Sequence, residues 1–114
     1  MTQKDKELLL IDLCARLPYG VVVKDRNGVH KLTPTNTEFI DLFNGKCNIA
    51  PYLFPLSSMT EEQKKEWRSL MIRDSYGILY PTIDSFDYIY KNHIDFRGLI
   101  SMGLANDATN LNIY

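Results

Sequence analysis

Two Asn-Gly dipeptides, Asn27-Gly28 and Asn44-Gly45, constrain this chain more than any other local feature. Asn and Gly tolerate the positive φ angles that the tight primed turns of β-hairpins require. The first dipeptide lies between residues 19–24 and 29–32, two runs rich in β-branched side chains. This pattern predicts a β-hairpin.

The second dipeptide leaves two interpretations open. It lies between residues 39–43 and 46–49, and we favour a second hairpin over 38–49. A short helix is the alternative, because Thr35 can cap it, Glu38 falls at its third position and Gly45 follows its end.

Three further segments carry helix signals. A helix over residues 2–17 begins with the capping pair Thr2 and Asp5 and ends before Pro18. Its apolar stripe is expected to contain Leu10, Leu13, Cys14 and Leu17, whereas Asp12 is expected to lie mostly on the other side.

The second of these helices starts at residues 58–63, where Ser58 with Glu61 and Thr60 with Gln63 are alternative capping boxes. We expect Trp67 on its buried face. A third helix runs from Thr82 to about Asn92, although the alternation of aromatic residues there also fits a strand.

Residues 51–56 are apolar but contain two prolines, which we interpret as excluding a central strand and favouring an edge strand or connector. With 114 residues, the chain is long enough for a single domain, 1–114. We predict an α+β fold. Two antiparallel hairpins form a small curled sheet or a partly open barrel, with the N-terminal and C-terminal helices packed on one face.

Residues 51–66, 92–100 and 13–21 together resemble a family of small uncharacterised proteins found in gut anaerobic bacteria and their prophages. That family has no established activity to transfer. The resemblance implies an accessory protein of phage or mobile-element origin, and it favours the helix over residues 86–92.

His93, Asp95 and Arg97 are the only cluster of polar residues that suggests chemistry, because they place a base, an acid and a cation within five residues. They are candidates for an acid–base or anion site. The alternative, which we favour, is that Asp95 caps a short helical turn ended by Gly103 and that Arg97 forms an ion pair.

Other chemistry has little support. The two Cys and two His residues are scattered and predict no metal site, and no cofactor is expected. A nucleophile at Cys14 is disfavoured because we place that residue on the apolar stripe. The spacing of Gly98 and Gly103 matches a phosphate loop, but the Lys-Ser/Thr that would contact phosphate is missing.

The charge balance argues against a dedicated nucleic-acid binder, because 13 basic residues face 14 acidic ones. Lys24, Arg26, Lys31 and Lys46 nevertheless lie in or beside the expected hairpins and are candidates for a local basic patch.

No apolar run suits a membrane span or a signal peptide, so we expect a cytoplasmic protein with reduced cysteines. The leading hypothesis is a non-enzymatic interaction protein whose partner is another protein. The alternatives are a nucleic-acid-binding module that uses the hairpin sheet, and a small enzyme centred on His93, Asp95 and Arg97.

Overall fold

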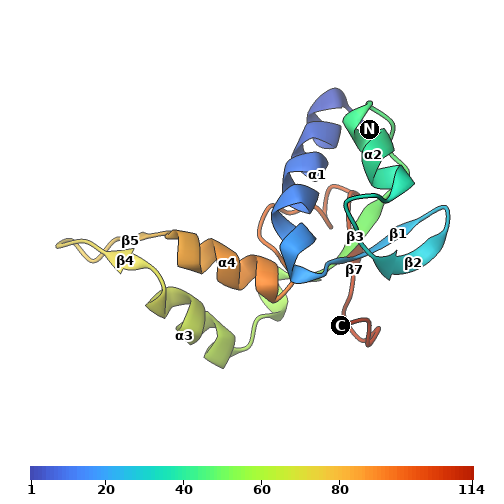
Figure 1. The fold of residues 1–114 in the computed structure, drawn as a ribbon. Coiled ribbons are helices and arrows are strands. Elements are labelled where there is room, and N and C mark those ends of the chain that lie inside the picture. The colour runs from blue at the N-terminus through green and yellow to red at the C-terminus, as the bar shows by residue number, and fades with distance from the viewer.

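The computed structural model describes residues 1–114 and confirms the α+β class. Figure 1 shows a body, which holds the first two helices and the larger sheet, and an arm that projects from it. The α-helices are α1 (Gln3–Arg16), α2 (Thr37–Phe43), α3 (Glu61–Ser69) and α4 (Ile83–Lys91). The strands are β1 (Val22–Asp25), β2 (Gly28–Lys31), β3 (Ala50–Pro55), β4 (Ile72–Arg73), β5 (Leu79–Tyr80), β6 (Ile94–Asp95) and β7 (Asn106–Asp107). Short 3-10 turns occupy Leu17–Tyr19 and Leu56–Ser58.

The larger sheet is mixed rather than antiparallel, and it is not closed into a barrel. β1 pairs antiparallel with both β2 and β3, whereas β6 and β7 pair parallel with β3. β3 therefore has the most neighbours, and our expectation that its two prolines exclude a central strand is wrong.

The direction of the backbone groups explains why β3 tolerates its prolines. The Leu53 carbonyl accepts from Ala108, while the adjacent Phe54 N–H donates to the His93 carbonyl. These two groups of a trans peptide point in opposite directions, so β7 and β6 lie on opposite edges of β3. Successive residues of a strand direct their backbone groups to alternate edges. The nitrogens of Pro51 and Pro55 therefore face the same edge as the Leu53 carbonyl, which is the β7 edge. β7 pairs there only with Tyr52 and Leu53, so neither proline removes a donor to β7.

The first predicted hairpin is confirmed, with Val22 opposite Lys31 and Asp25 opposite Gly28. Its turn differs from the expected primed type. Gly28 has φ 101°, but neither central residue, Arg26 or Asn27, has a positive φ. In a primed turn the positive φ would fall at the central residues, whereas here it falls at Gly28, the residue that follows them.

The second predicted hairpin is wrong, because residues 37–43 form helix α2. The cap is Asn36 rather than Thr35. Its side-chain oxygen accepts from the Phe39 N–H at 2.8 Å, and its amide nitrogen donates to Asp25 in the hairpin at 3.2 Å. Gly45, with φ 81°, ends the helix instead of turning a hairpin.

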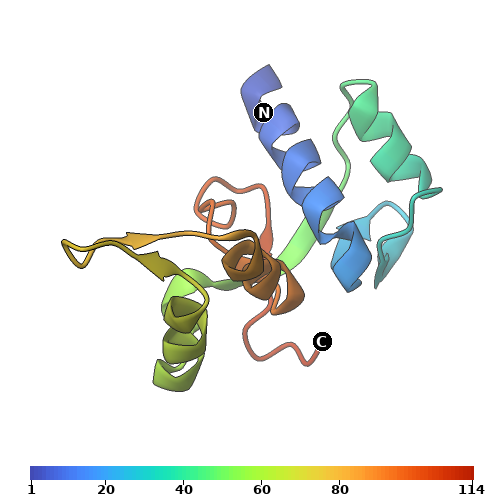
Figure 2. The same ribbon diagram turned by 60° about the vertical axis from the view of Figure 1, so that its left-hand side comes forward.

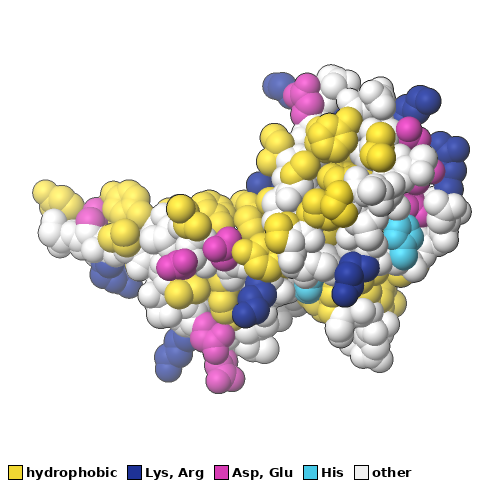
Figure 3. Space-filling model, viewed as in Figure 1, with side chains coloured by type: hydrophobic (Ala, Val, Ile, Leu, Met, Phe, Trp, Pro, Cys, Tyr) yellow, Lys and Arg dark blue, Asp and Glu magenta, His cyan; other side chains and the backbone are white.

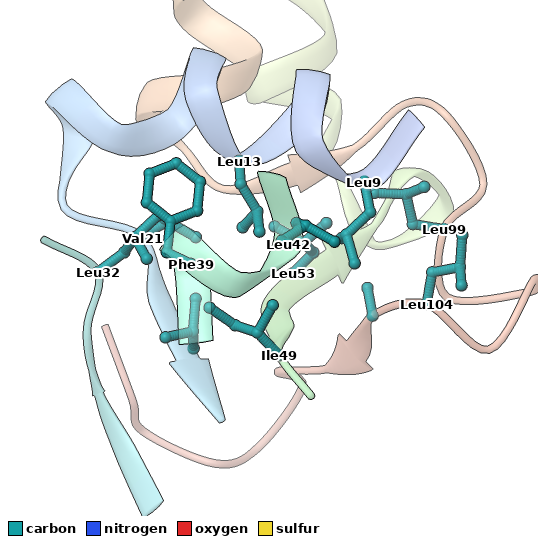
Figure 4. Close-up of a cluster of buried hydrophobic side chains, with 12 residues drawn as sticks. Leu9, Leu13, Val21, Leu32, Phe39, Leu42, Ile49, Leu53, Leu99 and Leu104 are labelled. Atoms are coloured by element: carbon teal, nitrogen blue, oxygen red, sulfur yellow. The ribbon is translucent and has the colours of Figure 1, made fainter. Parts of the chain in front are cut away.

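The main core lies between α1, α2 and the sheet (Figure 4). It contains Leu9, Leu13, Val21, Val23, Leu32, Phe39, Leu42, Ile49, Leu53, Leu99, Leu104 and Ala105. The buried face of α1 differs from the expected stripe, because Cys14 is exposed while Asp12 is buried. Cys14 and Cys47 are both free thiols.

The arm consists of α3, β4, β5 and α4, residues 61–91, and it extends away from the body in both ribbon views (Figures 1 and 2). Thr60 with Gln63 forms the capping box of α3, and Thr82 caps α4. The expected burial of Trp67 is wrong: no residue of α3 is fully buried, and the Trp67 ring is only partly covered, against the cluster of Met59, Ile89 and Ile94. None of the four helices has the length and apolar character needed to cross a membrane.

Candidate functional site

The residues His93, Asp95 and Arg97 do not converge on one cavity, since each has a different environment. The Asp95 carboxylate is buried and accepts from the backbone N–H groups of Leu99 and Ile100, each at 2.9 Å. It thereby caps the turn that ends at Gly103, whose φ is 75°. Asp95 has the capping role that we favoured from the sequence.

Arg97 belongs to a buried ionic network that the sequence analysis missed. Its guanidinium donates to Asp12 Oδ1, and Arg16 Nε donates to Asp12 Oδ2 at 2.8 Å. Arg16 Nη2 also donates to the Ile94 carbonyl at 2.6 Å. Asp12 and Arg16 are fully buried, and this network joins α1 to β6 and to the segment that follows β6.

A sequence signal for this network was present. Asp12 and Arg16 are four residues apart, and they fall in phase with Leu9 and Leu13, which line the main core. Residues 9, 12, 13 and 16 lie on one face of the helix, so the face that buries the two leucines also buries Asp12 and Arg16. Their opposite charges and mutual hydrogen bond make this burial possible.

His93 lies apart from both residues and adopts φ 57°, an uncommon backbone conformation for a residue other than glycine. Its ring stacks on Tyr114 with 3.6 Å between the centroids and 9° between the planes. Burial, together with the nearby charge of Arg16, lowers the pKa of His93 to about 4. The imidazole is therefore neutral at physiological pH.

The cavity beside His93 has a volume of about 550 Å³ and lies among the end of β3, the start of α3, the end of α4 and residues 109–114. Its charged lining residue is Lys91; neither Asp95 nor Arg97 lines it. Burial raises the pKa of Tyr114 to about 12, so this phenol also stays neutral. A neutral imidazole and a neutral phenol provide no charged acid–base pair near pH 7.

Tyr114 has a structural role at the edge of this cavity. Its hydroxyl accepts from the Val22 N–H at 2.9 Å and donates to the Tyr52 carbonyl at 2.7 Å. The side chain thus bridges β1 and β3 and holds the ring against His93.

The four basic residues near the hairpins do not form one free surface. Lys24 and Lys31 share a face of the hairpin, because Lys31 is opposite Val22 and side chains two apart on a strand point the same way. Arg26 instead pairs with the buried Glu38 of α2 at 3.3 Å. Lys46 is exposed on the loop after α2.

His30, on the second strand of this hairpin, forms a hydrogen bond with Asp25 on the first strand. Its Nε2 lies 2.7 Å from Asp25 Oδ2, and its Nδ1 lies 3.1 Å from the Lys31 carbonyl oxygen. The hydrogen bond to Asp25 raises the pKa of His30. Both ring nitrogens face acceptors, which suits the doubly protonated imidazolium and links the two strands.

No three or more His, Cys, Asp and Glu side chains are close enough to hold a metal ion. The most distinctive surface is on the arm, where hydrophobic side chains extend along one side from the tip to the body (Figure 3). The exposed large apolar residues of the arm are Ile72, Tyr76, Ile78, Tyr80, Ile83 and Phe86.

Comparisons with protein-family models, curated proteins and solved structures gave no match to this chain.

Proposed function

We propose that this protein is a non-enzymatic interaction protein that binds a protein partner through the arm. The observation that supports this function is the set of six exposed apolar side chains on one projecting element. Tyr76 is 88% exposed and Ile83 is 80% exposed. Contiguous apolar surface of this kind typically marks a binding site, and Tyr is favoured where binding energy concentrates.

The internal bonding of the arm tip supports the same function. Asp74 accepts from the backbone N–H groups of Tyr76 and Ile78, each at 2.9 Å, and from the Tyr80 hydroxyl at 3.1 Å. Arg73 donates to the Gly77 carbonyl at 2.8 Å. These bonds hold the tip in one shape, so less conformational entropy is lost when a partner binds.

We further propose that the protein acts as an accessory factor of a phage or mobile element. The resemblance of residues 51–66 and 92–100 is the basis for this context. A test is whether the gene lies among mobile-element genes in the source genome.

Photo-crosslinking tests the binding function. A photoreactive phenylalanine analogue at Tyr76 should capture a protein when the variant is produced in its native source. The matched control places the same analogue at Val29, which is 53% exposed on β2, outside the arm. Equal capture from both positions, or no capture from Tyr76, would contradict the proposal.

Nucleic-acid binding makes a different prediction. Because Arg26 is engaged with Glu38, we expect no binding to random DNA tighter than about 10⁻⁵ M at physiological salt, the usual non-specific range. Micromolar binding that weakens steeply between low and high salt would favour the nucleic-acid function. Charge reversal at Lys24 and Lys31 would then test the shared hairpin face.

A further inference from the structure

The β4–β5 hairpin is a separate two-stranded sheet at the end of the arm. Each strand has only two residues, with Ile72 opposite Tyr80 and Arg73 opposite Leu79. No third strand pairs with either one. A two-stranded hairpin on its own is marginally stable in water, whereas three or more strands with a covered apolar face are stable.

The apolar side chains of the hairpin lie largely on one face. Ile72 and Tyr80 are directly opposite, and Ile78 precedes Tyr80 by two residues along the strand direction. On α4, Ile83 and Phe86 are three residues apart and share a helix face. The arm therefore offers an apolar face next to unpaired strand edges.

The exposed area is sufficient for a stable complex. From their exposed fractions, the six apolar residues leave on the order of 800 Å² accessible, which is what one partner contributes to a standard interface. The arm also makes the molecule elongated, since its radius of gyration is 15.0 Å. A compact domain of this length has a radius of gyration of about 13 Å.

We propose that the partner covering this face is a second copy of the chain. Two arms pack face to face and antiparallel about a two-fold axis, so that the apolar side chains of each arm cover those of the other. This inference rests on the proposed function, because it identifies the partner of the same surface.

Charge and symmetry favour a second copy as the occupant. Residues 61–91 contain six acidic and five basic side chains, so the arm is nearly neutral and does not repel its own copy. A two-fold interface brings the same patch of each subunit together, so an apolar face covers an identical apolar face.

Sedimentation velocity of the purified full chain over a range of concentrations tests the proposal. We expect a concentration-dependent dimer. Ile83→Asp should weaken it at least tenfold, because the carboxylate would be buried in the interface. The fold should persist, since Ile83 is the first residue of α4 and an acid there suits the helix dipole.

The matched control is Ile11→Asp, which changes an exposed isoleucine on α1, outside the arm. It should leave the dimer unchanged, and circular dichroism should show that both variants retain their helices. Amide hydrogen exchange over residues 72–80 should also slow as dimer forms, because the second arm covers the apolar face of the hairpin and stabilises it.

A chain that stays monomeric at high concentration would overturn the proposal, and so would equal weakening by both variants. The crosslink at Tyr76 distinguishes failure of the dimer from failure of binding through the arm. Capture of a different protein by a monomeric chain would refute the dimer but retain the binding function. A monomeric chain whose arm captures nothing would refute both.

Discussion

Removing the carboxylate of Asp12 should destabilise the fold more than any surface substitution. Asp12 accepts charged hydrogen bonds from both Arg16 and Arg97. In Asp12→Ala, Arg16 remains fully buried with the Ile94 carbonyl as its acceptor, and its Nη1 already lacks a partner. Breaking a buried ion pair by deleting one member costs about 3–5 kcal/mol.

This loss is large beside the total stability of a typical domain, about 5–15 kcal/mol. With a urea slope of about 1–2 kcal/mol per molar, the unfolding midpoint should fall by roughly 1.5–5 M. Equilibrium urea unfolding followed by tryptophan fluorescence measures this shift.

Two further variants make the reasoning refutable. Glu7→Ala removes an exposed acid from the same helix and should change the free energy of unfolding by less than about 0.5 kcal/mol. The double variant Asp12→Leu, Arg16→Met should recover much of the loss, because it replaces both buried charges with apolar side chains. A loss below about 1 kcal/mol in Asp12→Ala would show that Arg16 reaches water and that the network is not buried.

Three other substitutions probe the arm and the cavity. Trp67→Ala removes the single tryptophan, so its urea unfolding is followed by circular dichroism; it should cost about 2 kcal/mol, less than a fully buried aromatic, because the ring is only partly covered, and a loss of 4 kcal/mol would mean full burial. Tyr114→Phe should cost about 1–2 kcal/mol, because it removes the hydroxyl that bridges β1 and β3, and an unchanged midpoint would contradict that bridge. The pKa of His93 is about 4 in the folded chain and 6.5 without the shift. Between these two pH values the unfolded chain binds a proton that the folded chain does not, so the free energy of unfolding decreases as the pH falls. His93→Asn, which tolerates the positive φ, should abolish a pH-dependent loss of up to about 3 kcal/mol, and parallel pH profiles of the two proteins would rule out this source.

The helix starts could be predicted from the sequence because their interactions are local. Thr2, Thr60 and Thr82 each cap a helix through a backbone N–H three residues along. The first hairpin was predictable for the same reason, since a short turn joins two β-branched runs. These features need only neighbours in the chain, so the residues themselves specify them.

Residues 37–49 were decided by a distant contact. Asn44-Gly45 suits a hairpin turn and also suits a helix end, and the local pattern cannot separate the two. In the folded chain, Asn36 caps α2 and also donates to Asp25 of the first hairpin. The two hydrogen bonds use both polar atoms of the Asn36 side chain and join the start of α2 to the first hairpin.

The position of β3 also required the tertiary structure. A proline excludes a strand from a sheet interior only if its nitrogen faces a pairing neighbour. Which edge each nitrogen faces, and how far β7 extends along it, depends on residues some fifty positions away in the sequence.

The roles of His93, Asp95 and Arg97 also depend on partners from other elements. The sequence placed His93, Asp95 and Arg97 within five residues, and it favoured a cap and an ion pair over a catalytic site. The structure confirmed the cap at Asp95 and assigned Asp12, a distant residue on α1, as the partner of Arg97. A buried charge is tolerated only where an opposite charge or hydrogen-bond donors satisfy it, and these partners come together only in the folded chain.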